Sequence, residues 1–384
     1  MNQPNNRKNI ASTSKVLIVD DDLSARLVLK RFLTVAGFVH IEEAGDGWQA
    51  LQKISDNRPD LILLDMYMEP MNGLDLCREL NRKNMFGDMV VIMQTGEDKP
   101  EVKAMMFDVG VTDYITKPIH AAEITSRIFA HLERQHLIRN VEANYQRIQD
   151  ELKEAIILQN VLLPQDEVIE QIQHDLAMQM AHYYFPATEL AGDYLSVRQL
   201  SKRKVALIAG DVAGHGVTAA LYAFSIHALI EERLLSEHAP GVLLGLLNDK
   251  LYTFMQPGKF ATMFVGIIDY DTNTLQYASA ASPPPFLISE GKVRKLNTQG
   301  YLLGSQKMAA YPTLSETFKS GDLLRLYSDA LLETINEQGA YRSEEAVEEL
   351  LLANEKNEVS EILKQLLSLF YSHADRPQDD LSIL

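Results

Sequence analysis

Hydrophobic and polar positions follow two alternating patterns between residues 15 and 135. Segments of helical length are amphipathic, as in LSARLVLKRFLTVAG (23–37), which has Gly37 at its C-cap. The segments between them are short apolar runs typical of buried strands: VLIV (16–19), VHIEEA (39–44), LILLD (61–65), MVVIM (89–93) and DYIT (113–116). Five strands alternating with five helices predict an α/β doubly wound domain with a five-stranded parallel sheet, whose functional crevice lies at the carboxyl ends of the strands.

A long segment without glycine or proline follows, from residue 121 to residue 163. Its apolar positions alternate at spacings of 3 and 4, which predicts the seam of a coiled coil. The seam consists of Ile138, Val141, Tyr145, Ile148, Leu152, Ala155, Gln159 and Leu162. Tyr145 and Gln159 are imperfect seam residues, so pairing is expected to be weak or regulated. The alternative is one helix packed on its own domains.

Strand patterns return after Asp166, separated by turn sequences that predict hairpins: SKRK, YDTNT and SEGK. Helices are expected near 216–235, 240–255, 343–353 and 359–371. These elements predict an α+β domain, an antiparallel β-sandwich flanked by helices. The chain is therefore expected to be multidomain: a disordered tail (1–13), the α/β domain (14–135), a helical coiled-coil linker (136–165) and the α+β domain (166–384).

Composition narrows the class of protein. The formal net charge is −17, which argues against broad binding to nucleic acid or anionic membranes. Cys77 is the only cysteine, so no intrachain disulfide is possible. No apolar stretch reaches the roughly 20 residues that span a bilayer, and the polar start MNQPNNRKNIASTS lacks the apolar core of a signal peptide. We expect a cytoplasmic protein with neither nucleic acid nor membrane as partner.

Polar residues gather at the predicted carboxyl ends of the strands in the first domain. Asp20 and Asp21 follow the first strand, and Asp65, Thr95 and Lys117 follow the third, fourth and fifth. Three converging carboxylates repel one another and favour a divalent cation such as Mg²⁺. A neighbouring lysine and hydroxyl could then stabilise a transferred phosphoryl group.

The motifs IVDDD, LLDMYMEPMNG, MQTG and YITKP closely resemble those of response-regulator receiver domains. The resemblance implies that Asp65 accepts a phosphoryl group from a sensor histidine kinase. It further implies a Mg²⁺ held by Asp20, Asp21, Asp65 and the Tyr67 carbonyl. Thr95 and Lys117 would bind the phosphoryl oxygens, and Tyr114 would change rotamer on activation. One departure is Met68-Glu69-Pro70, where the family usually has Met-Pro.

A second set of acidic residues lies at or beside predicted strands of the α+β domain. Asp193 occurs in LAGDYLSV, Asp211 in AGDVAGHG, Asp329 in LYSDALLE, and Asp379 precedes Asp380 in PQDDLSIL. Glycines beside the first two allow the close backbone approach that a metal site using a main-chain carbonyl requires. Carboxylates without His or Cys favour Mg²⁺ or Mn²⁺ over zinc.

The order of these motifs resembles the metal-dependent protein phosphatases (PPM superfamily), specifically the bacterial stage II sporulation E branch. The resemblance extends over roughly residues 155–384 and includes QNVLLP. It implies that Asp211 bridges two Mn²⁺ or Mg²⁺ ions, joined by the Val212 carbonyl, and that Asp193, Asp329 and Asp379 complete the catalytic set. Water activated by the metals would attack the phosphorus of phosphoserine or phosphothreonine.

Several positions depart from that family. Ala330 replaces the glycine of the usual Ser-Asp-Gly, and Ala281 and Ser282 replace a glycine-histidine pair. Leu195 and Ser196 stand where relatives often have an acidic residue, and the final motif ends in Leu381-Ser382. These changes leave open an alternative, a catalytically weak or silent phosphatase-fold adaptor that binds a partner under receiver control.

His215 is a second open question. It could act as a general acid or only shape a glycine turn, and we favour the latter. Trp48, the only tryptophan, is expected to pack within the first domain.

The two predicted activities suggest a regulated enzyme. Phosphorylation of Asp65 would alter the helical seam and move the Asp211 loop into metal-binding geometry, through the linker and the helices near 216–255. The family implies that the substrate is a phosphorylated anti-sigma-factor antagonist and that the output is a change in transcription.

Overall fold

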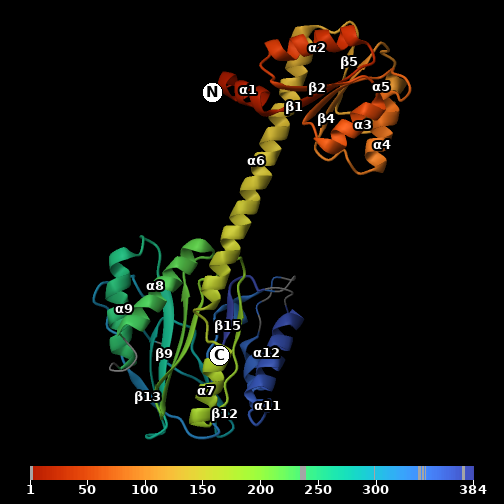
Figure 1. The fold of residues 1–384 in the computed structure, drawn as a ribbon. Helices are drawn as coiled ribbons and strands as arrows, with labels where there is room; N and C mark the ends of the chain where they lie inside the picture. Colours follow the sequence, from red (N-terminus) through yellow and green to blue (C-terminus); the bar gives the residue numbers. More distant parts are fainter. Residues whose placement is uncertain are drawn as a thin grey trace. The chain divides into compact units, whose positions relative to one another are not determined.

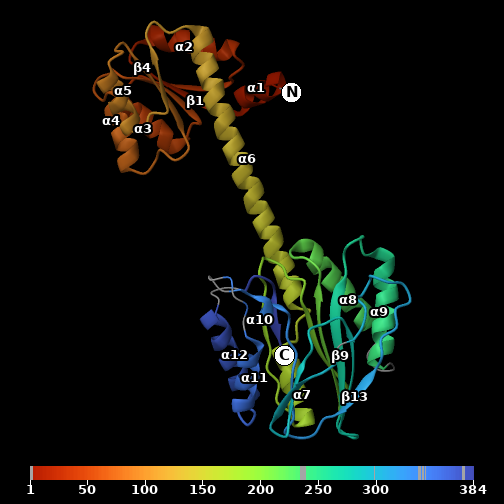
Figure 2. The same ribbon diagram turned by 180° about the vertical axis from the view of Figure 1, so that it is seen from behind.

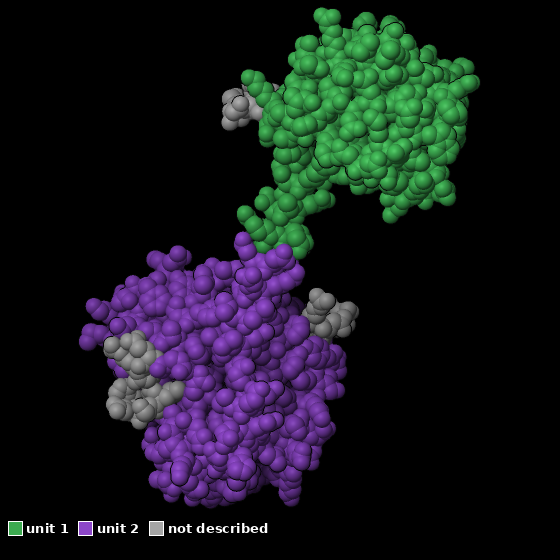
Figure 3. Space-filling view, viewed as in Figure 1, with its two compact units in different colours: residues 1–148 green, residues 149–384 purple. Residues whose placement is uncertain are grey.

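The computed structural model describes residues 3–233, 239–297, 299–335, 339, 341, 343–373 and 377–384. The chain divides into two compact units, residues 1–148 and 149–384 (Figure 3). No helix in the described part of the chain is both long and apolar enough to cross a membrane.

The first unit is built on a five-stranded sheet in the order β2-β1-β3-β4-β5, with all neighbours parallel. The strands are β1 (Lys15–Val19), β2 (His40–Ala44), β3 (Leu61–Asp65), β4 (Val90–Thr95) and β5 (Asp113–Thr116). The connecting helices are α2 (Leu23–Val35), α3 (Gly47–Asp56), α4 (Gly73–Arg82), α5 (Pro100–Asp108) and α6 (Ala121–Asn160). The predicted doubly wound α/β fold is confirmed.

The tail is where the first unit differs from expectation. Residues 3–13 form helix α1 (Gln3–Thr13), and Ile10 and Ala11 are buried in the core that also contains Phe129. The Arg7 guanidinium lies over the Phe129 ring and bonds Glu133. The expectation of a disordered tail is therefore wrong for this segment, because its two apolar residues find apolar surface on the rest of the unit.

The expected long helix is present as α6, which is 40 residues long (Figure 1). Val141 and Tyr145 on the predicted seam are 68% and 63% exposed. Gln159 instead is buried within the second unit. Pairing of α6 with a second helix stays a prediction.

The second unit contains an antiparallel five-stranded sheet in the order β13-β10-β9-β8-β7. Its strands are β7 (Tyr194–Ser201), β8 (Lys204–Val212), β9 (Ala261–Asp269), β10 (Thr274–Ala280) and β13 (Leu314–Thr317). The SKRK, YDTNT and SEGK turns all join paired antiparallel strands, as expected.

Smaller antiparallel sheets form the other half of the sandwich. One has the order β12-β11-β14, and the other pairs β15 with β6. Their strands are β6 (Tyr183–Phe185), β11 (Phe286–Ser289), β12 (Lys292–Lys295), β14 (Leu323–Arg325) and β15 (Leu381–Ile383). Backbone hydrogen bonds between Leu326 and Leu384 connect the two small sheets. The core between the halves includes Val197, Leu207, Phe264 and Leu287.

Helices flank the sandwich on both sides (Figures 1 and 2). Helices α8 (Val217–Arg233) and α9 (Pro240–Phe254) pack on the five-stranded sheet, whereas α11 (Glu344–Ala353) and α12 (Val359–His373) cover the small sheets. Residues 234 and 235 of the first expected helix lie outside the described residues. Two elements were not expected: α10 (Ala330–Glu333) and α7 (Asp166–Leu176), where the sequence had suggested strands.

Candidate functional site

The first candidate site lies at the carboxyl ends of β1, β3 and β5. Asp20 and Asp65 are buried, Asp21 is exposed, and one carboxylate oxygen from each lies within 4.8 Å of the others. Lys117 Nζ lies 2.9 Å from Asp65 Oδ1 and 3.4 Å from Asp20 Oδ2. Burial and the nearby Asp65 charge raise the pKa of Asp20, although the Asp22 N–H and Lys117 oppose the shift. Clustered hard oxygen ligands of this kind fit Mg²⁺.

The other residues predicted for this site lie on or directly after β3, β4 and β5. Thr95 is buried at the end of β4, where its Oγ1 accepts a 3.0 Å hydrogen bond from the Glu97 N–H. Tyr67 follows β3, is exposed, and donates its hydroxyl to Glu97 Oε1 at 2.7 Å. Tyr114 on β5 packs edge-to-face on Phe107. Trp48 is 56% exposed, so the expectation that it is a packing residue is wrong.

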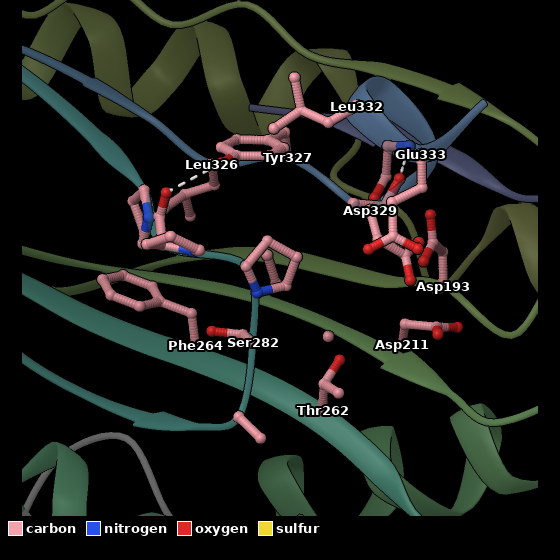
Figure 4. Close-up of a pocket in the computed structure, with 18 of the residues that line it drawn as sticks. Asp193, Asp211, Thr262, Phe264, Ser282, Leu326, Tyr327, Asp329, Leu332 and Glu333 are labelled. Carbon is pink, nitrogen blue, oxygen red and sulfur yellow. Dashed lines mark hydrogen bonds between the residues drawn. The ribbon is translucent and has the colours of Figure 1, made fainter. Parts of the chain in front are cut away.

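The second candidate site lies where β7 and β8 meet. Asp193 immediately precedes β7 and Asp211 lies near the end of β8, and the register pairs Tyr194 with Gly210, so the two carboxylates belong to adjacent strands. Asp329 precedes α10. All three line one pocket of about 430 Å³, and Figure 4 shows their carboxylates close together on one side of it.

Two glycines allow this close approach. A Cβ on Gly192 would lie 2.7 Å from the Val212 carbonyl oxygen and 3.2 Å from Asp211 Oδ1. A Cβ on Gly210 would lie 2.7 Å from the Thr262 carbonyl oxygen. A larger residue at position 192 would therefore push the Asp193 segment away from β8, and one at position 210 would push β8 away from β9.

The electrostatics of the second site favour a cation. Burial, followed by the charges of Asp329, Asp379 and Asp380, raises the pKa of Asp211 to about 7. Burial and Asp211 raise the pKa of Asp193 well above its usual value, although a hydrogen bond with the Ser382 side chain opposes the shift, and Asp193 Oδ2 is buried without a hydrogen-bond partner among the described residues. A divalent ion would provide the missing partner and offset the repulsion, so this donor set fits Mg²⁺ or Mn²⁺.

The second site is more open than the first. In the described part of the second unit, no three carboxylates offer oxygens within 4.8 Å of one another. Asp379 is exposed and does not line the pocket, but its charge raises the pKa of both Asp211 and Asp329.

Asp380 has a role that differs from that of its neighbour. Its Oδ1 accepts a 2.8 Å hydrogen bond from the Ala187 N–H, and its Oδ2 accepts a 2.6 Å bond from the Gly192 N–H. The Ser328 hydroxyl donates to the Asp380 carbonyl at 2.8 Å. Asp380 thus fixes the segment that leads to Asp193.

The departures from the family pattern have different structural consequences. Ala330 begins α10 and is buried in a helical conformation, so a glycine is not needed there. Ala281 has φ +54°, a left-handed conformation that favours glycine, and it lines the pocket beside Ser282. His215 is exposed between Gly214 (φ +102°) and Gly216 (φ +76°) and is not among the residues that line the pocket.

Sequence reasoning missed other residues of the pocket. Glu333 lines it, and its charge helps to raise the pKa of Asp329, second to burial. The spacing of four residues from Asp329 on one helical turn could have indicated this. Lys295 and Glu344 form an ion pair that lines the same pocket, and no local signal joins β12 to α11.

The two candidate sites fall in regions that match two different protein families. Residues 16–129 match the response regulator receiver domain, and residues 201–384 match stage II sporulation protein E (SpoIIE). The chain therefore joins a region that matches receiver domains to a region that matches SpoIIE. The SpoIIE match includes Asp211, Asp329 and Asp379, whereas Asp193 precedes it. The position of Asp193 beside Asp211 therefore rests on the strand register.

Similar proteins cover separate parts of the chain. The response regulators MprA of Mycobacterium sp. (strain KMS) and Mycobacterium ulcerans (strain Agy99) are 36% identical over 120 residues and 35% identical over 123. These alignments cover 31% and 32% of this chain, and the chain spans about half the length of these relatives, 51% and 52%. The SiaA-PP2C domain of Pseudomonas aeruginosa has the same fold as the second unit, with a TM-score of 0.56, 19% identity, and coverage of 63% of this chain and 97% of that one.

Proposed function

We propose that this protein is a two-component response regulator in which phosphorylation of Asp65 controls a metal-dependent phosphoserine/phosphothreonine protein phosphatase. The observation that carries the proposal is the buried Asp193 Oδ2, which has no hydrogen-bond partner among the described residues and lies beside Asp211 in a pocket that also contains Asp329. Carboxylates with raised pKa values in a concave site are typical of a catalytic centre.

Catalysis is assigned to the acidic residues that line one side of the pocket, Asp193, Asp211 and Asp329, together with Asp379 outside it. Asp211, the Val212 carbonyl, Asp193, Asp329 and Asp379 would hold two Mn²⁺ or Mg²⁺ ions. When bound, such ions supply Lewis acidity and an activated water for in-line attack on phosphorus. Asp380 holds the Asp193 segment in place, and Gly192 keeps it against Val212.

The receiver domain supplies the input. Asp65 would accept the phosphoryl group from a sensor histidine kinase with Mg²⁺ at Asp20, Asp21, Asp65 and the Tyr67 carbonyl. Lys117, already 2.9 Å from Asp65, would neutralise charge on the transferred group together with the Thr95 hydroxyl. Tyr114 would change its packing on phosphorylation.

The proposed substrate rests on the family resemblance, and the proposed dimer rests on the exposed seam of α6. The substrate would be a phosphorylated anti-sigma-factor antagonist, so the protein would act in the cytoplasm and affect transcription. A homodimer would form through the exposed part of the α6 seam, which includes Val141, Tyr145 and Ile148. Neither nucleic acid nor a membrane is proposed as a partner.

The proposal is tested by Mn²⁺-dependent hydrolysis of a phosphoserine peptide, with and without beryllofluoride. Asp211→Asn should reduce hydrolysis at least about a hundredfold, because it removes the bridging ligand. Asp271→Asn, in an exposed hairpin turn where Asp271 pairs with Arg203, is the matched control and should keep wild-type activity. Beryllofluoride should change the wild-type rate and leave Asp65→Asn unaffected.

The second candidate function is the phosphatase-fold adaptor. The strained Ala281 beside the pocket is the observation that favours it. An adaptor predicts no hydrolysis and no Mn²⁺ binding in any receiver state. That combined result would overturn the enzyme and support the adaptor.

A further inference from the structure

Gln159, near the end of α6, makes a two-point contact with the backbone of one residue of the second unit, Ala191. Its Nε2 donates to the Ala191 carbonyl at 2.7 Å, and its Oε1 accepts from the Ala191 N–H at 3.2 Å. The Gln159 side chain is 4% exposed and Ala191 is fully buried. Buried amide groups matched in this way are costly to separate, because each unpaired group loses its hydration without compensation.

Ala191, which Gln159 holds, lies two residues before the candidate metal ligand Asp193. Residues 186–193 belong to no helix or strand, so their position depends on side-chain contacts rather than on a strand ladder. Gln159 holds Ala191, and Asp380 holds Ala187 and Gly192. A shift of Gln159 would therefore move the segment that aims Asp193.

The same residue belongs to the heptad seam of α6. Its spacing places it on one face with Val141 and Tyr145, which are exposed. A coiled coil continued to the end of α6 would need the face that Gln159 now presents to Ala191. Pairing of α6 and seating of Gln159 on the phosphatase unit are thus alternatives at this position.

We propose that Gln159 is a positioning residue through which the linker helix holds Asp193 in metal-binding geometry. The seating of α6 then sets the metal affinity of the phosphatase site. This inference rests on the proposed phosphatase function, since it assigns a metal to Asp193. It gives the receiver a specific contact through which α6 acts on the catalytic centre.

The test compares Gln159→Met with Gln165→Met in the full chain. Methionine keeps the length of the side chain and removes both hydrogen bonds to Ala191. Gln165 lies six residues further on and donates to the Asn160 and Leu163 carbonyls without contacting Ala191, so it is a matched control. If Gln159→Met does not fold, Gln159→Ala leaves room for water to reach Ala191.

Two measurements separate positioning from mere stability. Calorimetric titration with Mn²⁺ should give a dissociation constant about 10–100-fold higher for Gln159→Met, the effect usual for residues that orient ligands. Hydrogen exchange of the metal-free chain should be faster in residues 186–195. Hydrolysis should recover toward the wild-type rate at saturating Mn²⁺, whereas Gln165→Met should match the wild type throughout.

Each outcome decides between the two proposals. Mn²⁺ binding by the wild type with an unchanged constant and unchanged exchange in Gln159→Met would overturn this inference and leave the phosphatase intact. A lower melting temperature with unchanged Mn²⁺ affinity would make Gln159 structural only. A wild type that binds no Mn²⁺ would overturn the proposed function and this inference with it.

Discussion

At the scale of single residues, the buried ionisable side chains of the second unit have different surroundings. Asp380 is buried and satisfied by two backbone N–H groups. Burial instead raises the pKa of both Asp193 and Asp211, which line a pocket where a cation can bind. Arg325 has neither arrangement: it is 0% exposed, and none of its guanidinium nitrogens has a hydrogen-bond partner among the described residues.

We expect replacement of Arg325 by leucine to stabilise the protein. Arg325 on β14 is two residues from both Leu323 and Tyr327, so its side chain shares their face toward the core under α11 and α12. Burial lowers the pKa of Arg325 to about 10, so it remains charged at pH 7. Arg325→Leu should raise the free energy of unfolding by about 1–4 kcal/mol, measured by urea denaturation.

Arg294→Leu is the control for this prediction. Arg294 lies on β12 in the same sheet, is half-exposed and pairs with Glu316. Its replacement should change stability by less than about 0.5 kcal/mol. Destabilisation by Arg325→Leu would mean that the guanidinium has a compensating partner.

At the scale of elements, α6 is attached to the receiver sheet at the amino-terminal ends of β3 and β4. Arg139 bonds Asp88 Oδ2 at 2.5 Å and Asp60 Oδ1 at 2.7 Å, and Gln135 donates to the Asp88 carbonyl at 2.5 Å. Asp60 and Asp88 precede β3 and β4, the strands that end in Asp65 and Thr95. The long helix is thereby linked to the strands that carry the phosphorylation site.

The stability that this attachment contributes should depend on pH. The Arg139 hydrogen bond is the main reason that the pKa of Asp88 is lowered in the folded state. A depressed acidic pKa stabilises the fold above the unfolded pKa of about 4, and the contribution disappears as pH falls through the folded value. Arg139→Gln should therefore lower the melting temperature by up to a few degrees at pH 7, and the difference should shrink at pH 3.

The size of this effect is limited by exposure, since both side chains are about half-exposed and solvent screens the pair to less than about 1 kcal/mol. Arg134→Gln, an exposed position on the same helix, should behave as the wild type at both pH values. A melting difference for Arg139→Gln that is the same at pH 7 and pH 3 would contradict the prediction.

At the scale of the whole molecule, one helix belongs to both units and carries an apolar seam. The exposed seam residues Val141, Tyr145 and Ile148 have no covering element in the described chain. Burying them against a second copy would remove apolar surface from water. Tyr145 and Gln159 fit a coiled-coil seam poorly, so they would limit the strength of pairing.

We expect Val141→Glu to abolish the dimer, because it places a charge within the exposed part of the seam. Sedimentation analysis at micromolar concentration should give a dimer for the wild type and a monomer for this variant. Ile157→Glu is the matched control, since Ile157 is also exposed and apolar but lies off the seam. A monomeric wild type at about 100 μM would favour the single-helix alternative.

Helix α7 could have been predicted from the sequence, whereas helix α1 could not. The apolar spacing of Ile169, Ile172 and Leu176 is helical, so α7 was within reach. Helix α1 was not, because its stretch is polar apart from Ile10 and Ala11, and those residues are buried only by contact with distant parts of the chain such as Phe129.

The sequence by itself determined the alternation of elements, the order of the domains and the aspartates that mark both sites, because these follow from local periodicity and short motifs. Only the tertiary structure decided which side chains meet. Gln159 fits a heptad by spacing yet binds Ala191, and Asp380 rather than Asp379 holds the Asp193 segment. Hydrogen bonds and burial join residues far apart in the chain, and no local pattern encodes them.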